Sequence, residues 1–288
     1  MSPHARIVAI AVSYRSDDAA FAWVNAVGRA LQPVRRIAEV VVVDNTERAD
    51  SAAFFARLRT VDPAVIAMKA PGNLGYFGGA RYAWEEWQRS TSRLPDWVMV
   101  SNVDVGFHDG GFFLKLLAST YPAGTGVIAP SICSAARHGD WNPKIRRRPS
   151  RNRIHAYKAL FGNHWVLNLY EMAARIKHAA QGLTRRLKGR EDGPKDNAVQ
   201  KIYAPHGACM LFAREYFERG GDLNFPGFLF GEEVFVGETA RRLQLGVVYD
   251  PRLRMTSSDH VSTGRFRSRH MAKYMYDSAA ILAERYFP

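Results

Sequence analysis

Cysteine is scarce in this sequence of 288 residues, and long apolar stretches are missing. Cys133 and Cys209 are the only cysteines, and neither belongs to a C-x-x-C pair. This argues against a zinc site or a disulfide framework and fits a reducing cytosol. No stretch reaches the roughly 18 apolar residues that a transmembrane helix needs, so none is predicted. The apolar run at residues 7–12 is also too short for the core of a signal peptide.

Acidic residues are almost missing from one basic segment. Between residues 144 and 190 there are 13 lysines and arginines and a single acid, Glu171. This segment therefore carries a net charge of +12 out of the formal +13 of the whole chain, and the remainder is close to neutral. The basicity is a local feature rather than a property of the fold. Internal repeats and low-complexity segments are also absent from the sequence.

Composition and periodicity indicate a globular α/β protein. Hydrophobic residues make up 47% of the chain and charged residues 23%, which are ordinary values. The length suffices for one large α/β domain or two small ones with a sizeable core. Apolar, β-branched runs predict strands at residues 7–12, 39–43, 65–68 and 97–100, and helical spacing predicts helices at 17–31, 49–58 and 79–88. This alternation predicts a parallel, Rossmann-like sheet. Farther along, the pattern predicts order at 201–212, helices at 215–219, 232–243 and 271–286, and a strand at 246–249.

Two aspartates follow predicted strands directly. The run at residues 98–101 ends in Asn102-Val103-Asp104, and the run at 40–43 ends in Asp44. Carboxylates at the carboxyl ends of parallel strands face the crevice where open α/β sheets bind ligands. Asp104 is a hard oxygen ligand that suits Mg²⁺ or Mn²⁺ bridging to phosphate oxygens. Asp also ends strands as a turn former, and Asp44 could be a helix N-cap, but two acids placed alike favour a shared ligand site.

A glycine-rich segment at residues 72–80 follows a strand and opens a helix. Glycines allow the backbone to approach a phosphate, and the amino end of a helix favours anions. The segment lacks the Gly-Lys-Ser/Thr of a Walker A loop and is not a clean G-x-G-x-x-G, so on spacing alone a purely structural loop remains open.

Two later motifs carry titratable groups. Glu232 and Glu233 follow an aromatic run, and a carboxylate beside apolar walls is a candidate general base because desolvation raises its pKa. An acidic first helical turn is the alternative. His260 lies among small polar residues at 257–264, where an imidazole can ligate a metal or bind a diphosphate, unless it is only a solvated loop residue.

Taken in order, these motifs resemble glycosyltransferase family 2, the inverting GT-A enzymes, and in particular its bacterial rhamnosyltransferase-like branch. The resemblance covers residues 7–130 and 202–264. It is carried by six motifs, which read Val42-Val43-Asp44-Asn45, Asn73-Leu74-Gly75-Tyr76-Phe77-Gly78-Gly79, Asn102-Val103-Asp104, Gly207-Ala208-Cys209-Met210-Leu211, Glu232-Glu233 and His260-Val261-Ser262-Thr263.

The resemblance implies a single GT-A domain over residues 1–288. Its α/β fold would be a Rossmann-like, mostly parallel sheet flanked by helices, with a basic amphipathic helical insertion at 144–200 and a C-terminal helix. The implied donor is a UDP- or dTDP-sugar bound over the sheet. The residues implied to bind it are Ser13, Tyr14 and Asp44 at the base and ribose, Asn73 and Gly75 at the nucleotide edge, and Asn102 and Asp104 near the diphosphate.

The resemblance also implies the chemistry. Asp104 would hold Mg²⁺ or Mn²⁺ on the diphosphate, since Asn102 stands where the family's first acid can be, and His260 would assist at the metal or diphosphate. Glu233 stands at the position of the family's base, where the usual residue is Asp. It would take the proton of the acceptor hydroxyl during in-line attack, with Glu232 in support.

The basic segment has its own pattern, an apolar stripe flanked by lysines and arginines. The stripe is formed by Ile154, Tyr157, Phe161, Trp165, Leu169, Met172, Ile176, Ala180, Leu183 and Leu187, with a break near Gly162. Such a helix suits an anionic membrane interface. Packing of the stripe on the main domain is the alternative. Nucleic acid is not expected as a partner, because base-reading motifs are absent.

Together these patterns predict a metal-dependent inverting glycosyltransferase, peripheral on the cytoplasmic face of the membrane, that extends a lipid-linked bacterial surface glycan. A sugar-nucleotide nucleotidyltransferase shares the sheet but would need a basic glycine-rich loop after the first strand, for which residues 13–16 are a poor match. A membrane or nucleic-acid binding protein, in which the acids are only caps, is the non-enzymatic alternative.

Overall fold

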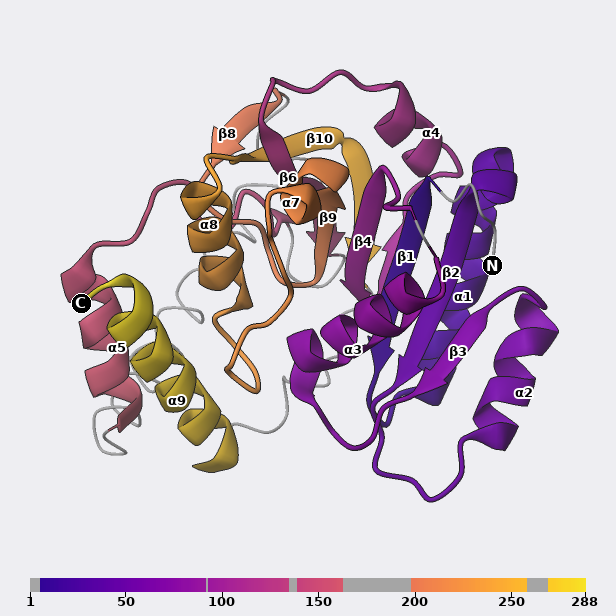
Figure 1. Cartoon of the computed structure of the whole chain (residues 1–288), viewed down its shortest axis with the longest axis horizontal. Coiled ribbons are helices and arrows are strands. Elements are labelled where there is room, and N and C mark those ends of the chain that lie inside the picture. The colour runs from indigo at the N-terminus through magenta and orange to yellow at the C-terminus, as the bar shows by residue number, and fades with distance from the viewer. Residues whose placement is uncertain (1–5, 92, 135–138, 163–197, 258–268) are drawn as a thin grey trace, which may run out of the picture.

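The computed structural model describes residues 6–91, 93–134, 139–162, 198–257 and 269–288. Its centre is one mixed sheet with helices on both faces (Figure 1). The strands of the described residues follow the order β3-β2-β1-β4-β9-β6-β10-β5, with β7 beside β6 and β8 beside β10. The sheet therefore joins a first half built in sequence order to a second half in which strands from distant parts of the chain alternate.

The first half of the chain forms the parallel part of the sheet. Its elements are β1 Ile7–Ser13, α1 Asp17–Leu31, a 3₁₀ helix at Gln32–Ile37, β2 Ala38–Asp44, α2 Ala52–Val61, β3 Ile66–Lys69, α3 Gly75–Arg89 and β4 Trp97–Asn102. β1 pairs in parallel with both β2 and β4, and β2 pairs in parallel with β3. Every residue of β1 and β2 is buried, as expected for strands covered on both faces.

The second half makes the sheet mixed. Its elements are β5 Val105–Phe107, α4 Phe112–Ala118, β6 Thr125–Ser134, β7 Gly139–Asp140, α5 Arg151–Gly162, β8 Gln200–Ile202, β9 Cys209–Ala213, α7 Arg214–Glu218, α8 Glu232–Arg242, β10 Gly246–Ser257 and α9 Arg269–Tyr286. β9 runs antiparallel between β4 and β6, and β5 runs antiparallel to β10. A mostly parallel sheet is thus observed from β3 to β4, and the sheet as a whole is mixed.

Two predicted boundaries are wrong for physical reasons. The strand expected at 246–249 continues through Pro251 to Ser257, because the pairing with β6 shifts register between Asp250 and Arg254. An irregularity of this kind accommodates a proline that cannot donate to the ladder. The helix expected from Gly79 begins at Gly75. Gly79 therefore lies inside α3, where a glycine is needed because the helix passes close to β1. A Cβ atom at this position would be 2.8 Å from Val12 Cγ1.

Helices α5 and α9 pack together at one side of the molecule, away from β3 (Figure 1). They meet closely at Gly162, where an added Cβ atom would lie 2.9 Å from the Tyr276 ring. Within the predicted apolar stripe, Ile154 is buried, and Tyr157 and Phe161 are half-buried. The rest of the stripe, from Trp165 onward, lies outside the described residues. No helix in the described part of the chain combines the length and apolarity needed to cross a membrane.

Candidate functional site

The carboxyl ends of β1, β2 and β4 bring three predicted residues to one edge of the sheet. Ser13 is paired in register with Asp44, and Asn102 is paired with Val12, one residue earlier on β1. This alignment follows from the parallel pairing, which places all strand ends of this group on the same side. The polar residues that end three separate strands are therefore neighbours in the fold.

Asn45 ties the glycine-rich segment to this edge. Its amide nitrogen donates to Asn73 Oδ1 at 3.1 Å and to the Gly75 carbonyl oxygen at 2.9 Å, while its Oδ1 accepts from the Leu74 amide at 3.0 Å. Asn73 Oδ1 in turn accepts from the Gly75 amide at 3.1 Å. The buried amide of Asn45, the residue directly after β2, thus holds Asn73 and Gly75 beside the strand edge. Asn45 was quoted within its motif but was not predicted as a site residue.

Gly75 also joins this segment to the aromatic loop before α8. Its φ is +73°, and a Cβ atom there would lie 1.9 Å from the Phe228 carbonyl oxygen. Only glycine combines this backbone conformation with such a close approach. The two loops therefore close on one another above the sheet.

Asp44 is fully buried, and both its carboxylate oxygens have partners. Oδ1 accepts from the Thr46 amide at 3.0 Å, and Oδ2 accepts from the Ser51 hydroxyl at 2.6 Å and lies 2.8 Å from Arg48 Nε. In this structure Asp44 organises the loop after β2. Its predicted contact with a nucleotide base or ribose stays a prediction.

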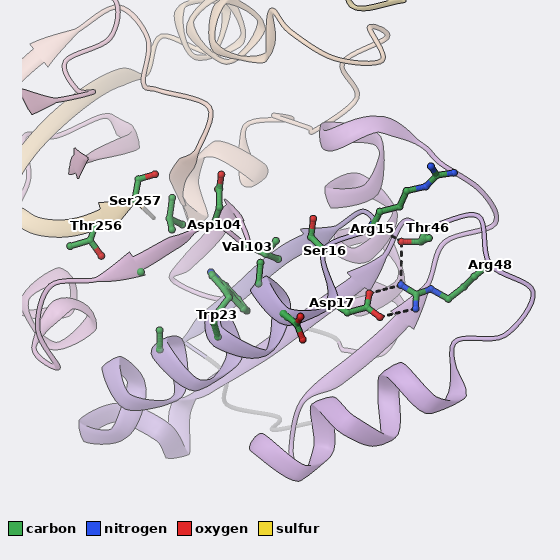
Figure 2. A pocket seen from close by; sticks show the side chains of 16 residues that line it. Arg15, Ser16, Asp17, Trp23, Thr46, Arg48, Val103, Asp104, Thr256 and Ser257 are labelled. Carbon is green, nitrogen blue, oxygen red and sulfur yellow. Dashed lines mark hydrogen bonds and ion pairs between the residues drawn. The ribbon is translucent and has the colours of Figure 1, made fainter. Parts of the chain in front are cut away.

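A cavity of about 950 Å³ runs along the amino-terminal half of α1 (Figure 2). Asp104 and Ser257 lie toward one end of it, and Thr46 and Arg48 lie toward the other (Figure 2). Its volume is in the range of small-molecule sites, roughly 300–1,000 Å³. Predicted Asp104 therefore shares a cavity with cationic and hydroxyl side chains that the sequence motifs did not single out.

The loop after β1 lines this cavity and has strained geometry. Arg15 has a φ of +50°, which is uncommon for a residue other than glycine. Its backbone amide donates to Thr46 Oγ1 at 2.9 Å, and its guanidinium carbon lies 5.3 Å from the centroid of the Tyr14 ring. Tyr14 itself is 36% exposed. Strained backbone of this kind is held by its surroundings and is frequent at functional sites.

Arg48 connects the loop after β2 to the beginning of α1. Besides Asp44 it pairs with Asp17, with Nη2 and Oδ1 2.6 Å apart (Figure 2). The hydrogen bond from Arg48 lowers the pKa of the Asp17 carboxyl, and the same pair raises the pKa of Arg48. Arg48 has no sequence signature, because it meets Asp17 only when α1 and the loop after β2 are brought together.

Asp104 lies in the turn between β4 and β5 and lines the cavity. The turn is fixed to the second half of the sheet, because the Asn102 amide donates to the Ala208 carbonyl oxygen at 2.9 Å. In the described ranges there is no cluster of three or more His, Cys, Asp or Glu side chains able to hold a metal. One carboxylate still fits Mg²⁺ or Mn²⁺ when diphosphate oxygens and waters complete the shell. His260, the other predicted ligand, lies outside the described residues.

The Glu232-Glu233 pair begins α8 after a left-handed turn. Phe230 and Gly231 have φ values of +68° and +92°. Glu232 is 7% exposed and its Oε1 accepts from the Phe230 amide at 3.1 Å. Burial, and then the charge of Glu233, raise the pKa of Glu232 to about 8. The more exposed Glu233 accepts from the Gly207 amide at 3.3 Å, which joins it to the Gly-Ala-x-Met-Leu motif.

Tyr76 is the point at which these motifs converge. Burial raises the pKa of its phenol well above the usual range, and the carboxylates of Glu232, Asp104 and Glu233 raise it further. Residues of three motifs far apart in the sequence therefore act on one buried hydroxyl group. No local pattern distinguishes Tyr76 within its motif, because the groups that act on it come from later parts of the chain.

The chain was compared with known proteins. No protein-family model matches it. It is 27% identical over 195 residues to the N-acetylglucosaminyl-diphospho-decaprenol L-rhamnosyltransferase of Mycobacterium tuberculosis, in strains CDC 1551 / Oshkosh and ATCC 25618 / H37Rv. The match covers 67% of this chain and 57% of each relative. The chain therefore spans little more than half the length of the curated relatives it matches.

Solved structures share the fold across almost the whole chain. GalNAc-T7 with UDP, GalNAc and Mn²⁺ superposes with a TM-score of 0.59 at 12% identity, over 98% of this chain and 49% of that one. S. aureus TarS 1-349 with UDP-GlcNAc gives a TM-score of 0.52 at 10% identity, over 96% and 66%. The predicted GT-A fold is confirmed, and the sequence match confirms the resemblance to a bacterial rhamnosyltransferase.

Proposed function

We propose that this chain, with its GT-A fold and its resemblance to a rhamnosyltransferase, transfers a sugar from a UDP- or dTDP-sugar to a hydroxyl group of a lipid-linked glycan. The proposal includes dependence on Mg²⁺ or Mn²⁺ and inversion at the anomeric carbon. The proposed role is the synthesis of a bacterial cell-envelope polysaccharide, in line with the decaprenol-linked acceptor named for the mycobacterial relatives.

One observation carries the proposal: the donor-side Asp104 and the acid pair Glu232-Glu233 all raise the pKa of the same buried phenol, that of Tyr76. A sugar transferase needs a place for the diphosphate leaving group and a base for the acceptor, close enough to act on one anomeric carbon. The convergence on Tyr76 supports this arrangement, since it joins a turn at the end of β4 to the first turn of α8.

On the donor side, Asp104 would hold the divalent cation. When bound, the metal would stabilise the negative charge that develops on the leaving diphosphate. Ser13, Tyr14 and Asn73 would contact the nucleoside, with Gly75 and Asn102 shaping the edge against which it lies. His260 would contribute to the metal or the diphosphate. Asp44 would hold the nucleotide-facing loop in place through its contacts with Thr46 and Arg48.

On the acceptor side, the two glutamates would divide the work through their protonation. Two close carboxylates favour a shared proton, and the buried member keeps it. With its pKa near 8, Glu232 is mostly neutral at pH 7, and Glu233 is the more exposed carboxylate of the two. Glu233 would take the proton of the attacking hydroxyl, and Glu232 would hold the Phe230-Gly231 turn in place.

The acceptor also bears on where the protein works. A lipid-linked acceptor would bring the chain to the cytoplasmic face of the membrane as a peripheral protein. The basic segment at 144–200, and within it residues 154–188, would contribute contacts to an anionic bilayer surface.

Release of free nucleoside diphosphate tests the proposal. The protein is incubated with UDP- and dTDP-sugars, Mn²⁺ and a lipid-diphosphate-linked N-acetylglucosamine, and the nucleotide products are separated. We expect acceptor-dependent release of nucleoside diphosphate, lost in Asp104→Asn and kept in Asp109→Asn. Asp109 is the matched control because it is an exposed acid five residues away that pairs with Lys115. When inorganic diphosphate is added, formation of nucleoside triphosphate and sugar 1-phosphate would instead indicate a nucleotidyltransferase, and no turnover with any donor would contradict the proposal.

A further inference from the structure

A second cavity, of about 800 Å³, opens beside the acid pair on the side of α5 and α9. Phe230 and Gly231, which lead into Glu232, form part of its wall. The remaining wall comes from the segment at residues 143–149, from α5, from α9 and from Val234 of α8. We call this cavity the α5–α9 groove. It is distinct from the cavity along α1, with which it shares no lining residue.

The α5–α9 groove is lined by two kinds of side chain. One part is apolar and includes Ile154, Tyr157 and Phe161 of α5 and Met275 and Leu282 of α9. Tyr157 and Phe161 are stacked, with ring centroids 6.1 Å apart. The other part is basic and contains Lys144, Arg146, Arg147 and Arg153. No acidic residue lines the groove, among the residues that the structure describes.

The basic side chains differ in how far they are already engaged. Arg146 donates to Gln200 Oε1 at 2.9 Å, and Arg153 donates to the Tyr157 hydroxyl at 3.1 Å. Lys144 and Arg147, by contrast, are exposed at the rim. Their neighbour Arg148 faces elsewhere, because it pairs with the buried carboxylate of Glu238 at 2.7 Å. Arg148 therefore stabilises the fold, whereas Lys144 and Arg147 are exposed at the groove.

Lys144 links the groove to the acid pair. Asn142 Oδ1 accepts from the Lys144 amide at 3.2 Å and from the His206 amide at 2.9 Å, which fixes the segment next to the Gly207 motif. The Lys144 charge acts on Glu232, whose pKa it lowers against the larger effect of burial. A ligand held by Lys144 and Arg147 would therefore extend toward Glu232 and Glu233.

We infer that the α5–α9 groove binds a polyprenyl diphosphate, the anionic lipid carrier of the acceptor glycan. This inference rests on the proposed function, in which a carrier-linked sugar meets Glu233. Arginine and lysine bind the diphosphate oxygens through charge-assisted hydrogen bonds, and the aromatic and aliphatic walls take the first isoprenoid units. In this arrangement the isoprenoid chain lies between α5 and α9, the diphosphate lies at Lys144 and Arg147, and the sugar lies at the acid pair.

Titration with farnesyl diphosphate in EDTA tests this inference, because removing divalent metal disables a metal-held diphosphate at Asp104. We expect saturable binding that is at least 10-fold weaker in the double variant Lys144→Ala, Arg147→Ala. The matched control is Arg151→Ala, an exposed arginine of α5 that does not line the groove, with an expected change below 2-fold. Phe161→Ser should weaken farnesyl diphosphate and leave inorganic diphosphate unchanged. The thermal midpoint of each variant establishes that it is folded.

Three results would overturn the inference. These are binding that appears only with Mn²⁺, equal affinity for farnesol and farnesyl diphosphate, and equal losses in the double variant and Arg151→Ala. Nucleoside diphosphate binding with Mn²⁺ is measured on the same proteins. If the nucleotide never binds while farnesyl diphosphate still does, the donor side of the proposed function fails and the groove assignment stands.

Discussion

Asp44 and Glu232 are both buried carboxylates beside the candidate site, but their surroundings differ. Asp44 receives the Thr46 amide, the Ser51 hydroxyl and the Arg48 guanidinium. Glu232 receives the Phe230 amide and lies next to a second carboxylate, Glu233. A buried charge is tolerated when it is paired, and otherwise the group takes up a proton.

The surroundings of Asp44 are suited to rigidity, and those of Glu232 are suited to proton transfer. Around Asp44, three donors hold the carboxylate in place, and this fixes the loops that line the cavity along α1. Around Glu232, burial and a neighbouring acid favour the neutral form. The strained turn at Phe230-Gly231 supports this second arrangement at a cost in backbone energy. Four measurements can separate these two kinds of surroundings.

Glu233→Gln should have the largest effect, on turnover. Loss of the proton acceptor with little change of shape is expected to lower kcat by roughly 10²–10⁴-fold while the affinity for the donor stays near that of the wild type. Steady-state kinetics and donor titration measure the two quantities. Glu232→Gln should cost less, because a neutral side chain already occupies that position at pH 7. A greater loss of kcat in Glu232→Gln would reverse the two roles.

Gly75→Ala should strongly destabilise the fold. The new Cβ atom would overlap the Phe228 carbonyl oxygen, 1.9 Å away, at a φ of +73°. We expect a loss of more than about 3 kcal/mol in the free energy of unfolding, measured by urea denaturation, since clash and left-handed strain add. Gly72→Ala is the control because nothing lies within 4 Å of its Cβ position. Equal losses in both variants would mean that the contact between the two loops does not form.

The free energy of unfolding of the wild type should depend on pH because of Glu232. Its pKa of about 8 in the folded state lies above the ordinary value of 4.5, so between these pH values the folded state binds the extra proton. This contribution is complete below pH 4.5 and is lost as the pH rises toward 8, at up to about 1.4 kcal/mol per pH unit. Unfolding free energies of wild type and Glu232→Gln across this range should therefore converge at low pH and separate at high pH, with the variant more stable. Parallel curves would show that Glu232 is charged in the folded protein.

Arg48→Met should have the smallest effect of the four, about 1–3 kcal/mol on the free energy of unfolding, since it leaves the Asp44 carboxylate buried with weaker compensation. Arg89→Met removes an exposed arginine that pairs with Glu86, and such a surface pair is worth roughly 0–1 kcal/mol. Thermal and urea unfolding compare the two. If the losses are the same, the Arg48 network does not stiffen the donor-side loop.

The sequence by itself determined the strands, the strand-end acids and the order of the motifs. β1 and β2 are continuous apolar runs, and their period and composition suffice to predict buried parallel strands. Asp44, Asp104 and the glutamate pair were found because each interrupts or follows a local pattern. The resemblance then joined these motifs into a GT-A fold, which the structural likenesses confirm.

Tertiary structure alone decided which groups meet. Asp104 and the glutamates act on Tyr76 although they lie in a turn after β4 and on α8, far from α3 in the sequence, and this proximity has no local signal. Arg48 pairs with Asp17 across 31 residues, and the charge of Lys144 acts on Glu232 across a still longer stretch of chain. The protonation of Glu232 likewise depends on burial, which only packing creates. Periodicity reports the backbone's local preferences, whereas contacts and desolvation arise from elements that are distant in the chain.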